Sequence, residues 1–364
     1  MFLAANPACS ETSISDAIQR LSRNAEPAVR LQIAVNLHLL QRTAPDTMWS
    51  LMAFISAEEP SRAVLQAAVA SISTLAGRYP ERVVPSIELI FDRTTSGTGS
   101  EAVRATCFST FLGLYLWRGL EACERRIIPV VDAPWESSEI ASHLAHTIRD
   151  DLTRGPSNPT DPQQEGVRRR ALWIINRLLE STTVELKRLR QQFSRPLDAI
   201  PPEIQARLKV IHNSIDSVAY QVFFASGAFD LQQNRPDEAP DREQRKRFLK
   251  EAEPIFDKLA DTRLTRVAYN LAATLESLME FDPAGVFLRL RNVVVGAQSG
   301  GFEFESLAAD VVVRTVKRFL AEYRAVLRER SDCRAALVQI LDVFVTVGWP
   351  AAQQLTYDLE EIFR

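Results

Sequence analysis

The chain has 364 residues, of which 46% are hydrophobic and 24% charged, and its formal net charge is −3. This is the composition of an ordinary folded protein, and the near balance of charge gives no general reason to expect a polyanionic partner. Because single compact cores rarely grow beyond about 250–300 residues, the length predicts either two lobes or one elongated array.

The first 120 residues contain an internal repeat at an offset of 35 residues. Residues 26–30 (EPAVR) align with 61–65 (SRAVL), and Pro45 aligns with Pro80. Apolar residues at helical spacing follow at the same offset: Leu37 and Ile72, Met48 and Val83, Met52 and Ile87. A helix–turn–helix unit of this length is typical of α-solenoids.

A third copy of the repeat begins at 101–104 (EAVR), and a weaker fourth copy begins at 165–168 (EGVR). One helix pair cannot bury its apolar face alone, so consecutive pairs are expected to stack on one another. Val29, Val64 and Val103 then occupy equivalent positions in successive units, and we predict that all three are buried.

The start of these copies, an acidic residue followed by Ala-Val-Arg and an apolar stripe, resembles the second helix of HEAT repeats. The resemblance is good over roughly residues 11–120 and weaker over 160–195. It implies an all-α fold, a HEAT-like α-α superhelix (solenoid) with longer and less regular helices in the C-terminal half. It implies no activity, because a fold does not determine a function.

The remaining two-thirds of the chain keep a helical pattern with few strand signals, and we expect more than 60% helix overall. The predicted helices are 121–131, 136–152, 163–194, 202–232, 240–260, 262–280, 283–297, 303–330, 333–346 and 350–363. Pro- and Asn-rich loops are predicted at 154–162 and 233–240. The expected organisation is HEAT-like repeats over 1–153, a loop at 154–162 and an irregular helical-repeat region over 163–364.

The N-terminus has no basic and apolar leader pattern, and no stretch approaches the roughly 20 apolar residues that span a bilayer. We therefore expect a cytoplasmic protein without membrane contact. Residues 1–10 look like a start cut into a longer array, since they carry no obvious polar cap. The sequence leaves open whether the chain is a fragment of a larger protein.

Enzyme chemistry is not indicated. The chain has no phosphate-loop, HExxH or GxSxG motif, and its four cysteines include no CxxC pair. His143, His146 and Asp150 share one helical face and could hold Zn²⁺ with an open position. We prefer a solvated polar face, because nothing nearby in sequence supplies supporting ligands. We predict no cofactor and no bound metal.

Basic residues gather in three segments. The first is 163–195 and the second is 242–250. The third is a row of Arg314, Lys317, Arg318, Arg324 and Arg328 beside the apolar seam of helix 303–330. The candidate surface for an anionic partner consists of this row together with Arg168, Arg169 and Arg170. These residues either form solvated faces with intrahelical pairs such as Arg318–Glu322 or line a groove for nucleic acid or an acidic protein.

We expect a non-catalytic helical-repeat scaffold for protein–protein interaction, for example the C-terminal sensor or assembly arm of a larger bacterial multidomain NTPase or defence protein. The alternative is a nucleic-acid-binding HEAT-like protein that uses the basic helix faces. A third class is an enzyme, either metal-dependent through His143 and His146 or similar to HEAT-like DNA glycosylases. A protein partner is expected, nucleic acid is an open alternative, and a small-molecule ligand is not expected.

Overall fold

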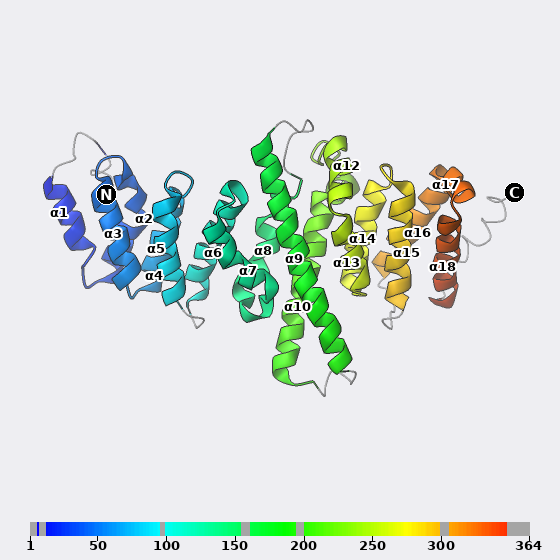
Figure 1. Cartoon of the computed structure of the whole chain (residues 1–364), viewed down its shortest axis with the longest axis horizontal. Helices are drawn as coiled ribbons and strands as arrows, with labels where there is room; N and C mark the ends of the chain where they lie inside the picture. Colours follow the sequence, from blue (N-terminus) through cyan, green and yellow to red (C-terminus); the bar gives the residue numbers. More distant parts are fainter. Residues whose placement is uncertain are drawn as a thin grey trace. The chain divides into compact units, whose positions relative to one another are not determined.

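The computed structural model describes residues 6, 12–94, 99–153, 161–193, 200–298 and 306–347 (Figure 1). These residues form eighteen α-helices and three short 3-10 helices, with 82% helix and no strand. The predicted all-α class and the expectation of more than 60% helix are therefore confirmed. No helix in these ranges combines the length and the apolar character needed to cross a membrane.

The chain divides into two compact units, Met1–Val130 with Glu136–Ile140, and Val131–Trp135 with Ala141–Arg364. The division falls within α7 (Glu121–Asp132) and α8 (Ser138–Thr147). The loop predicted at 154–162 lies, except for its last two residues, outside the described residues, so the boundary placed there stays a prediction.

The first unit consists of short helices in pairs. They are α1 (Thr12–Leu21), α2 (Pro27–Val35), the 3-10 helix η2 (Leu37–Gln41), α3 (Pro45–Glu58), α4 (Arg62–Ser73), α5 (Pro80–Arg93), α6 (Glu101–Arg118) and the first part of α7. Proline occupies the first turn of α2, α3 and α5, where its missing N–H costs no helical hydrogen bond. α4 packs against both α2 and α6, while α3 packs against α5.

The predicted 35-residue offset is confirmed in the helix bounds, because α3 and α5 begin and end at aligned positions. The aligned pairs Met48 and Val83, and Met52 and Ile87, are fully buried. The prediction for the three valines holds in part. Val64 and Val103 are each 1% exposed, but Val29 is only half-buried. The prediction for Val29 was wrong because α2 has only the short α1 on its outer side, whereas α4 is flanked by α2 and α6.

The arginine that follows the valine in the first and third copies anchors a neighbouring turn. Arg30 donates to two carbonyl oxygens before α2 (2.7 and 2.9 Å) and to both carboxylate oxygens of Glu59 (2.9 and 2.8 Å). Arg104 donates to two carbonyl oxygens at the end of α5 (3.2 and 2.8 Å) and lies 3.6 Å from Glu139. The repeated arginine thus ties its own helix to the segment that precedes it by donating to backbone carbonyl oxygens there.

The second unit contains longer helices, with α14 near its centre (Figure 1). Its elements are η3 (Pro134–Glu136), η4 (Arg149–Asp151), α9 (Pro162–Gln192), α10 (Pro202–Ala225), α11 (Ala228–Gln232), α12 (Arg242–Glu251), α13 (Glu253–Asp261), α14 (Thr265–Leu278), α15 (Pro283–Gln298), α16 (Ser306–Glu322), α17 (Arg324–Glu329) and α18 (Ser331–Val347). α14 packs against α10, α11, α12, α15 and α16.

Four of the predicted helices were wrong in length, because each is interrupted. Helix 202–232 breaks at Gly227, whose φ of 76° is left-handed. Helix 240–260 breaks at Ala252, because Pro254 begins a new helix and has no N–H to continue α12. Helix 303–330 ends at Glu322, and α17 begins after Tyr323, for which the local sequence offers no reason. Helix 136–152 separates into η3, α8 and η4. The helix predicted at 350–363 lies outside the described residues.

Candidate functional site

The candidate site lies where polar rows on α14 and α16 meet. On α16, Asp310, Arg314 and Arg318 are spaced by four residues and therefore share one face. On α14, Tyr269, Glu276 and the neighbouring Ser277 lie on a matching face. Apolar positions elsewhere on α16, among them Val312, Val316 and Phe319, are fully buried and hold that helix against the rest of the unit.

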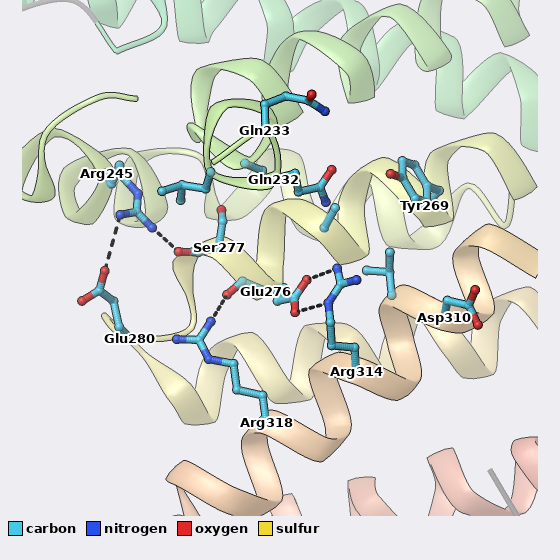
Figure 2. Close-up of a pocket in the computed structure, with 14 residues that line it drawn as sticks. Gln232, Gln233, Arg245, Tyr269, Glu276, Ser277, Glu280, Asp310, Arg314 and Arg318 are labelled. Atoms are coloured by element: carbon cyan, nitrogen blue, oxygen red, sulfur yellow. Dashed lines mark hydrogen bonds and ion pairs between the residues drawn. The ribbon is translucent and has the colours of Figure 1, made fainter. Parts of the chain in front are cut away.

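Between these rows and the helices α11 and α12 lies a cavity of about 820 Å³, which we name the α14–α16 pocket (Figure 2). Its polar lining residues are Gln232, Gln233, Arg245, Tyr269, Glu276, Ser277, Glu280, Asp310, Arg314 and Arg318. The volume lies in the range of roughly 300–1,000 Å³ that is usual for ligand sites. Three arginines and three carboxylates line it, so its formal charge is balanced.

The floor of the pocket is an ion pair between Arg314 and Glu276. Nε and Nη2 of Arg314 donate to the two carboxylate oxygens at 2.8 and 2.7 Å. The Glu276 side chain is only 14% exposed, whereas that of Arg314 is 54% exposed. The hydrogen bonds to Glu276 raise the pKa of Arg314 above its ordinary value, although partial burial acts in the opposite direction. This arginine is therefore occupied by a partner from its own chain.

Arg318 is held by two oxygens. Its Nη1 donates to the carbonyl oxygen of Glu276 at 3.2 Å, and its Nε donates to Glu322 at 3.0 Å. The predicted intrahelical pair Arg318–Glu322 is therefore confirmed. The contact with α14 was not predicted, and it places this arginine at the edge of the pocket.

Arg245 enters the pocket from α12 and is the least well satisfied of the three arginines. It donates to the carbonyl oxygen of Ser277 and, at 3.5 Å, to Glu280, which also lies 3.3 Å from Arg242. Burial lowers the pKa of Arg245, Glu280 opposes this, and the positive charges of Arg318 and Arg242 lower it further. Its Nε is buried with no acceptor among the described residues.

The structure brings together only part of the predicted basic surface. Arg314 and Arg318 line the pocket beside Arg245, which belongs to the second basic segment. Lys317, Arg324 and Arg328 are exposed and are not among the residues that line it. The predicted row was continuous along one helix, but the break at Tyr323 places Arg324 and Arg328 on α17.

The predicted residues of α9 lie elsewhere. Arg168 is 6% exposed, and it donates to Glu251 through Nε and Nη2 at 2.8 and 3.2 Å. Arg247 of the second segment is close enough for the charge of Arg168 to lower its pKa, after the larger effect of burial. Arg169 is exposed and Arg170 is half-buried. The basic segments therefore meet at two places, Glu251 and the α14–α16 pocket.

His146 belongs to a polar network on α8 and α10. Its Nδ1 lies 3.0 Å from Nε2 of Gln221 and 3.4 Å from Nη2 of Arg149, and Gln221 accepts a hydrogen bond from Arg149 at 2.5 Å. The side chain of His143 lies outside the described residues. Within the described ranges no group of three His, Cys, Asp or Glu side chains is placed to hold a metal ion.

A second cavity, of about 810 Å³, lies along α10 and contains His212 and Asp216 at a spacing of four residues. Burial lowers the pKa of His212, and the charge of Arg190 adds to this effect. Burial raises the pKa of Asp216, opposed by Arg266. Both side chains are thus biased toward their neutral forms.

Neither a protein-family model nor a curated protein matches this chain. A crystal structure described as that of an engineered protein aligns with 90% of this chain and 98% of its own, at 10% identity and a TM-score of 0.28. A likeness at that TM-score carries no argument about the fold or the function.

Proposed function

We propose that this chain is a non-catalytic helical-repeat scaffold that binds another protein. In this proposal the repeated units are HEAT-like, and the protein works in the bacterial cytoplasm. The 35-residue register of α2–α3 and α4–α5 supports the repeat class, because three aligned pairs are fully buried: Leu37 and Ile72, Met48 and Val83, and Met52 and Ile87.

The observation that carries the choice of partner is the charge balance of the α14–α16 pocket. A nucleic acid is attracted by cations that neutralise its phosphates and release its counterions. Arg245, Arg314 and Arg318 each already contact a carboxylate of this chain. Three carboxylates in the same cavity would also repel phosphates. A polypeptide, which carries both signs of charge and many hydrogen-bonding groups, suits such a surface better.

A nucleic-acid-binding role is the second candidate, and one observation favours it. Lys317, Arg324 and Arg328 are exposed, and within the described ranges no ion pair holds them. These cations are free to meet phosphates, although they lie outside the pocket.

A DNA titration separates the two functions. Fluorescently labelled duplex and single-stranded DNA are titrated with the protein at two salt concentrations. For a protein scaffold we expect no binding at micromolar protein near physiological salt. Micromolar binding that weakens steeply with salt, and that is lost in a Lys317→Gln, Arg324→Gln and Arg328→Gln triple variant, would replace the scaffold proposal with the nucleic-acid function.

A further inference from the structure

The charges of the α14–α16 pocket are separated along its length. In Figure 2, Arg245, Glu280 and Arg318 lie at one end, and Tyr269 and Asp310 lie at the other. The Glu276–Arg314 pair lies between the two ends and is neutral as a unit. The pocket is therefore balanced as a whole but dipolar from end to end.

The first end carries an excess of positive charge. Glu280 lies 3.3 Å from Arg242 and 3.5 Å from Arg245, and Arg318 pairs with Glu322. In these ion pairs of the described residues, three arginines meet two carboxylates. The side chain of Arg245 is 12% exposed. Arg245 and Arg318 keep their contacts with Glu280 and Glu322, but the remaining positive charge at this end would attract one carboxylate from a partner. Hydrogen bonds between such a carboxylate and a guanidinium group are charge-assisted and therefore strong.

The opposite end carries groups that attract a cation or a hydrogen-bond donor. Asp310 is exposed, and no ion pair within the described ranges neutralises it. Tyr269 is half-buried beside it in the pocket lining. Between the two ends, Gln232 at the end of α11 and Gln233 directly after it are exposed, and their amide groups can donate to and accept from a peptide backbone.

We propose that this pocket binds an extended segment of a partner protein that directs an acidic side chain to Arg245 and Arg318 and, further along, a basic side chain to Asp310. The inference rests on the proposed scaffold function and specifies its partner. Charge complementarity identifies the occupant. A uniformly anionic segment would be repelled by Asp310, Glu276 and Glu280, and a uniformly cationic segment would be repelled by the three arginines. Only a segment of mixed charge matches both ends.

The test uses short fluorescein-labelled peptides of about eight residues, long enough to cross a ligand-sized pocket in extended form. Each carries one glutamate and one lysine among small polar residues, with the spacing between the two charges varied. Control peptides carry two glutamates or two lysines. Binding to the full chain is measured by fluorescence anisotropy at low and physiological salt.

We expect a mixed-charge peptide to bind at least about tenfold more tightly than both controls at its best spacing. Arg318→Gln should remove that preference by weakening the contact with the glutamate. Arg324→Gln is the control, because this arginine lies on α17, directly after α16, and is not among the pocket residues. It should leave the affinity unchanged.

A charge exchange at Asp310 makes the test independent of general damage to the protein. Asp310→Lys should weaken binding of the mixed-charge peptide and strengthen binding of the peptide in which glutamate replaces lysine, a coupling expected for groups that lie close together. The pocket assignment is overturned if no peptide binds more tightly than about 1 mM. It is overturned equally if Arg318→Gln and Arg324→Gln change the peptide affinity by the same factor. The same holds if Asp310→Lys does not shift the preference from the mixed-charge peptide to the peptide with two glutamates.

The outcome for the pocket is separable from the outcome for the scaffold function. If a purified protein partner binds the wild-type chain and binds the Arg318→Gln and Asp310→Lys variants equally well, the scaffold function stands and the pocket assignment fails. If the DNA titration instead shows tight salt-dependent binding through Lys317, Arg324 and Arg328, the scaffold function itself fails.

Discussion

Arg314 on α16 and Glu276 on α14 are joined by two hydrogen bonds of 2.8 and 2.7 Å, although 38 residues separate them in sequence. The Glu276 side chain is largely buried and the Arg314 side chain is half-exposed. Water therefore solvates the carboxylate less than the guanidinium, and the carboxylate needs the ion pair more. The pair fixes α16 against α14 at the floor of the pocket.

Replacing Glu276 with Gln should lower the free energy of unfolding by about 1 kcal/mol, because the ion pair is lost while the side-chain shape is kept. Glu322→Gln is the control, since it removes the exposed intrahelical partner of Arg318 and should cost less than about 0.5 kcal/mol. Urea unfolding followed by circular dichroism measures both. Equal effects would show that the pocket pair is no stronger than a surface pair.

Val64→Asp should destabilise the first unit by at least about 3 kcal/mol, because it buries an unpaired charge at a position that is 1% exposed. Val29→Asp alters the aligned residue, which is only half-buried, and should cost clearly less. The midpoints of urea unfolding give the comparison. An unchanged midpoint for Val64→Asp would contradict the buried packing of α4.

Two glycines within helices should respond to alanine in opposite directions. A Cβ on Gly285 would lie 2.0 Å from Oδ2 of Asp282, whose Oδ1 accepts the Gly285 N–H at 3.0 Å at the start of α15. Gly285→Ala should therefore cost about 1 kcal/mol by displacing this cap. A Cβ on Gly113 in α6 meets nothing within 4 Å, so Gly113→Ala should stabilise by about 0.5–1 kcal/mol. Thermal unfolding of both variants tests the pair.

Cys107 and Cys123 should resist a thiol reagent at pH 8 in the native state. Burial raises the pKa of each thiol to about 12, so both are protonated and shielded. The same shift predicts lower stability as pH rises from 9 to 12, because the unfolded chain loses these protons first. The reaction is followed in variants that keep one cysteine, with urea-unfolded protein as the control. Rapid native labelling of either thiol would contradict the burial.

Much of the fold follows from local signals. The aligned prolines Pro45 and Pro80 and the apolar spacing behind them predict α3 and α5 with correct starts. Gly227 and Pro254 were signals for the breaks after α10 and α12, and the predicted helices ran through them because the apolar pattern continues on both sides. The break at Tyr323 has no such signal, since neither glycine nor proline is nearby.

The candidate site was predictable only where its contacts are local. Arg318 and Glu322 are four residues apart on one helix, so their pairing could be inferred from spacing. Glu276 lies on a separate helix and Glu280 lies just after that helix ends, and no periodicity links them to Arg314 or Arg245. Which arginines are neutralised therefore depends on how α14 packs against α12 and α16. Such contacts between helices could not be inferred from the spacing of residues within one helix.

The shared register of α2–α3 and α4–α5 makes the first unit modular in a practical sense. Removing residues 27–61 would join Glu26 to Arg62 and put α4–α5 in the place of α2–α3. The buried apolar residues of α4 and α5 would then stand at the aligned positions. The exchange would not be complete, because Leu65 replaces Arg30 at the aligned position and cannot donate to the carbonyl oxygens of the preceding turn. A shortened chain of this kind would keep its buried apolar contacts but lose the hydrogen bonds that tie α2 to the connection between α1 and α2.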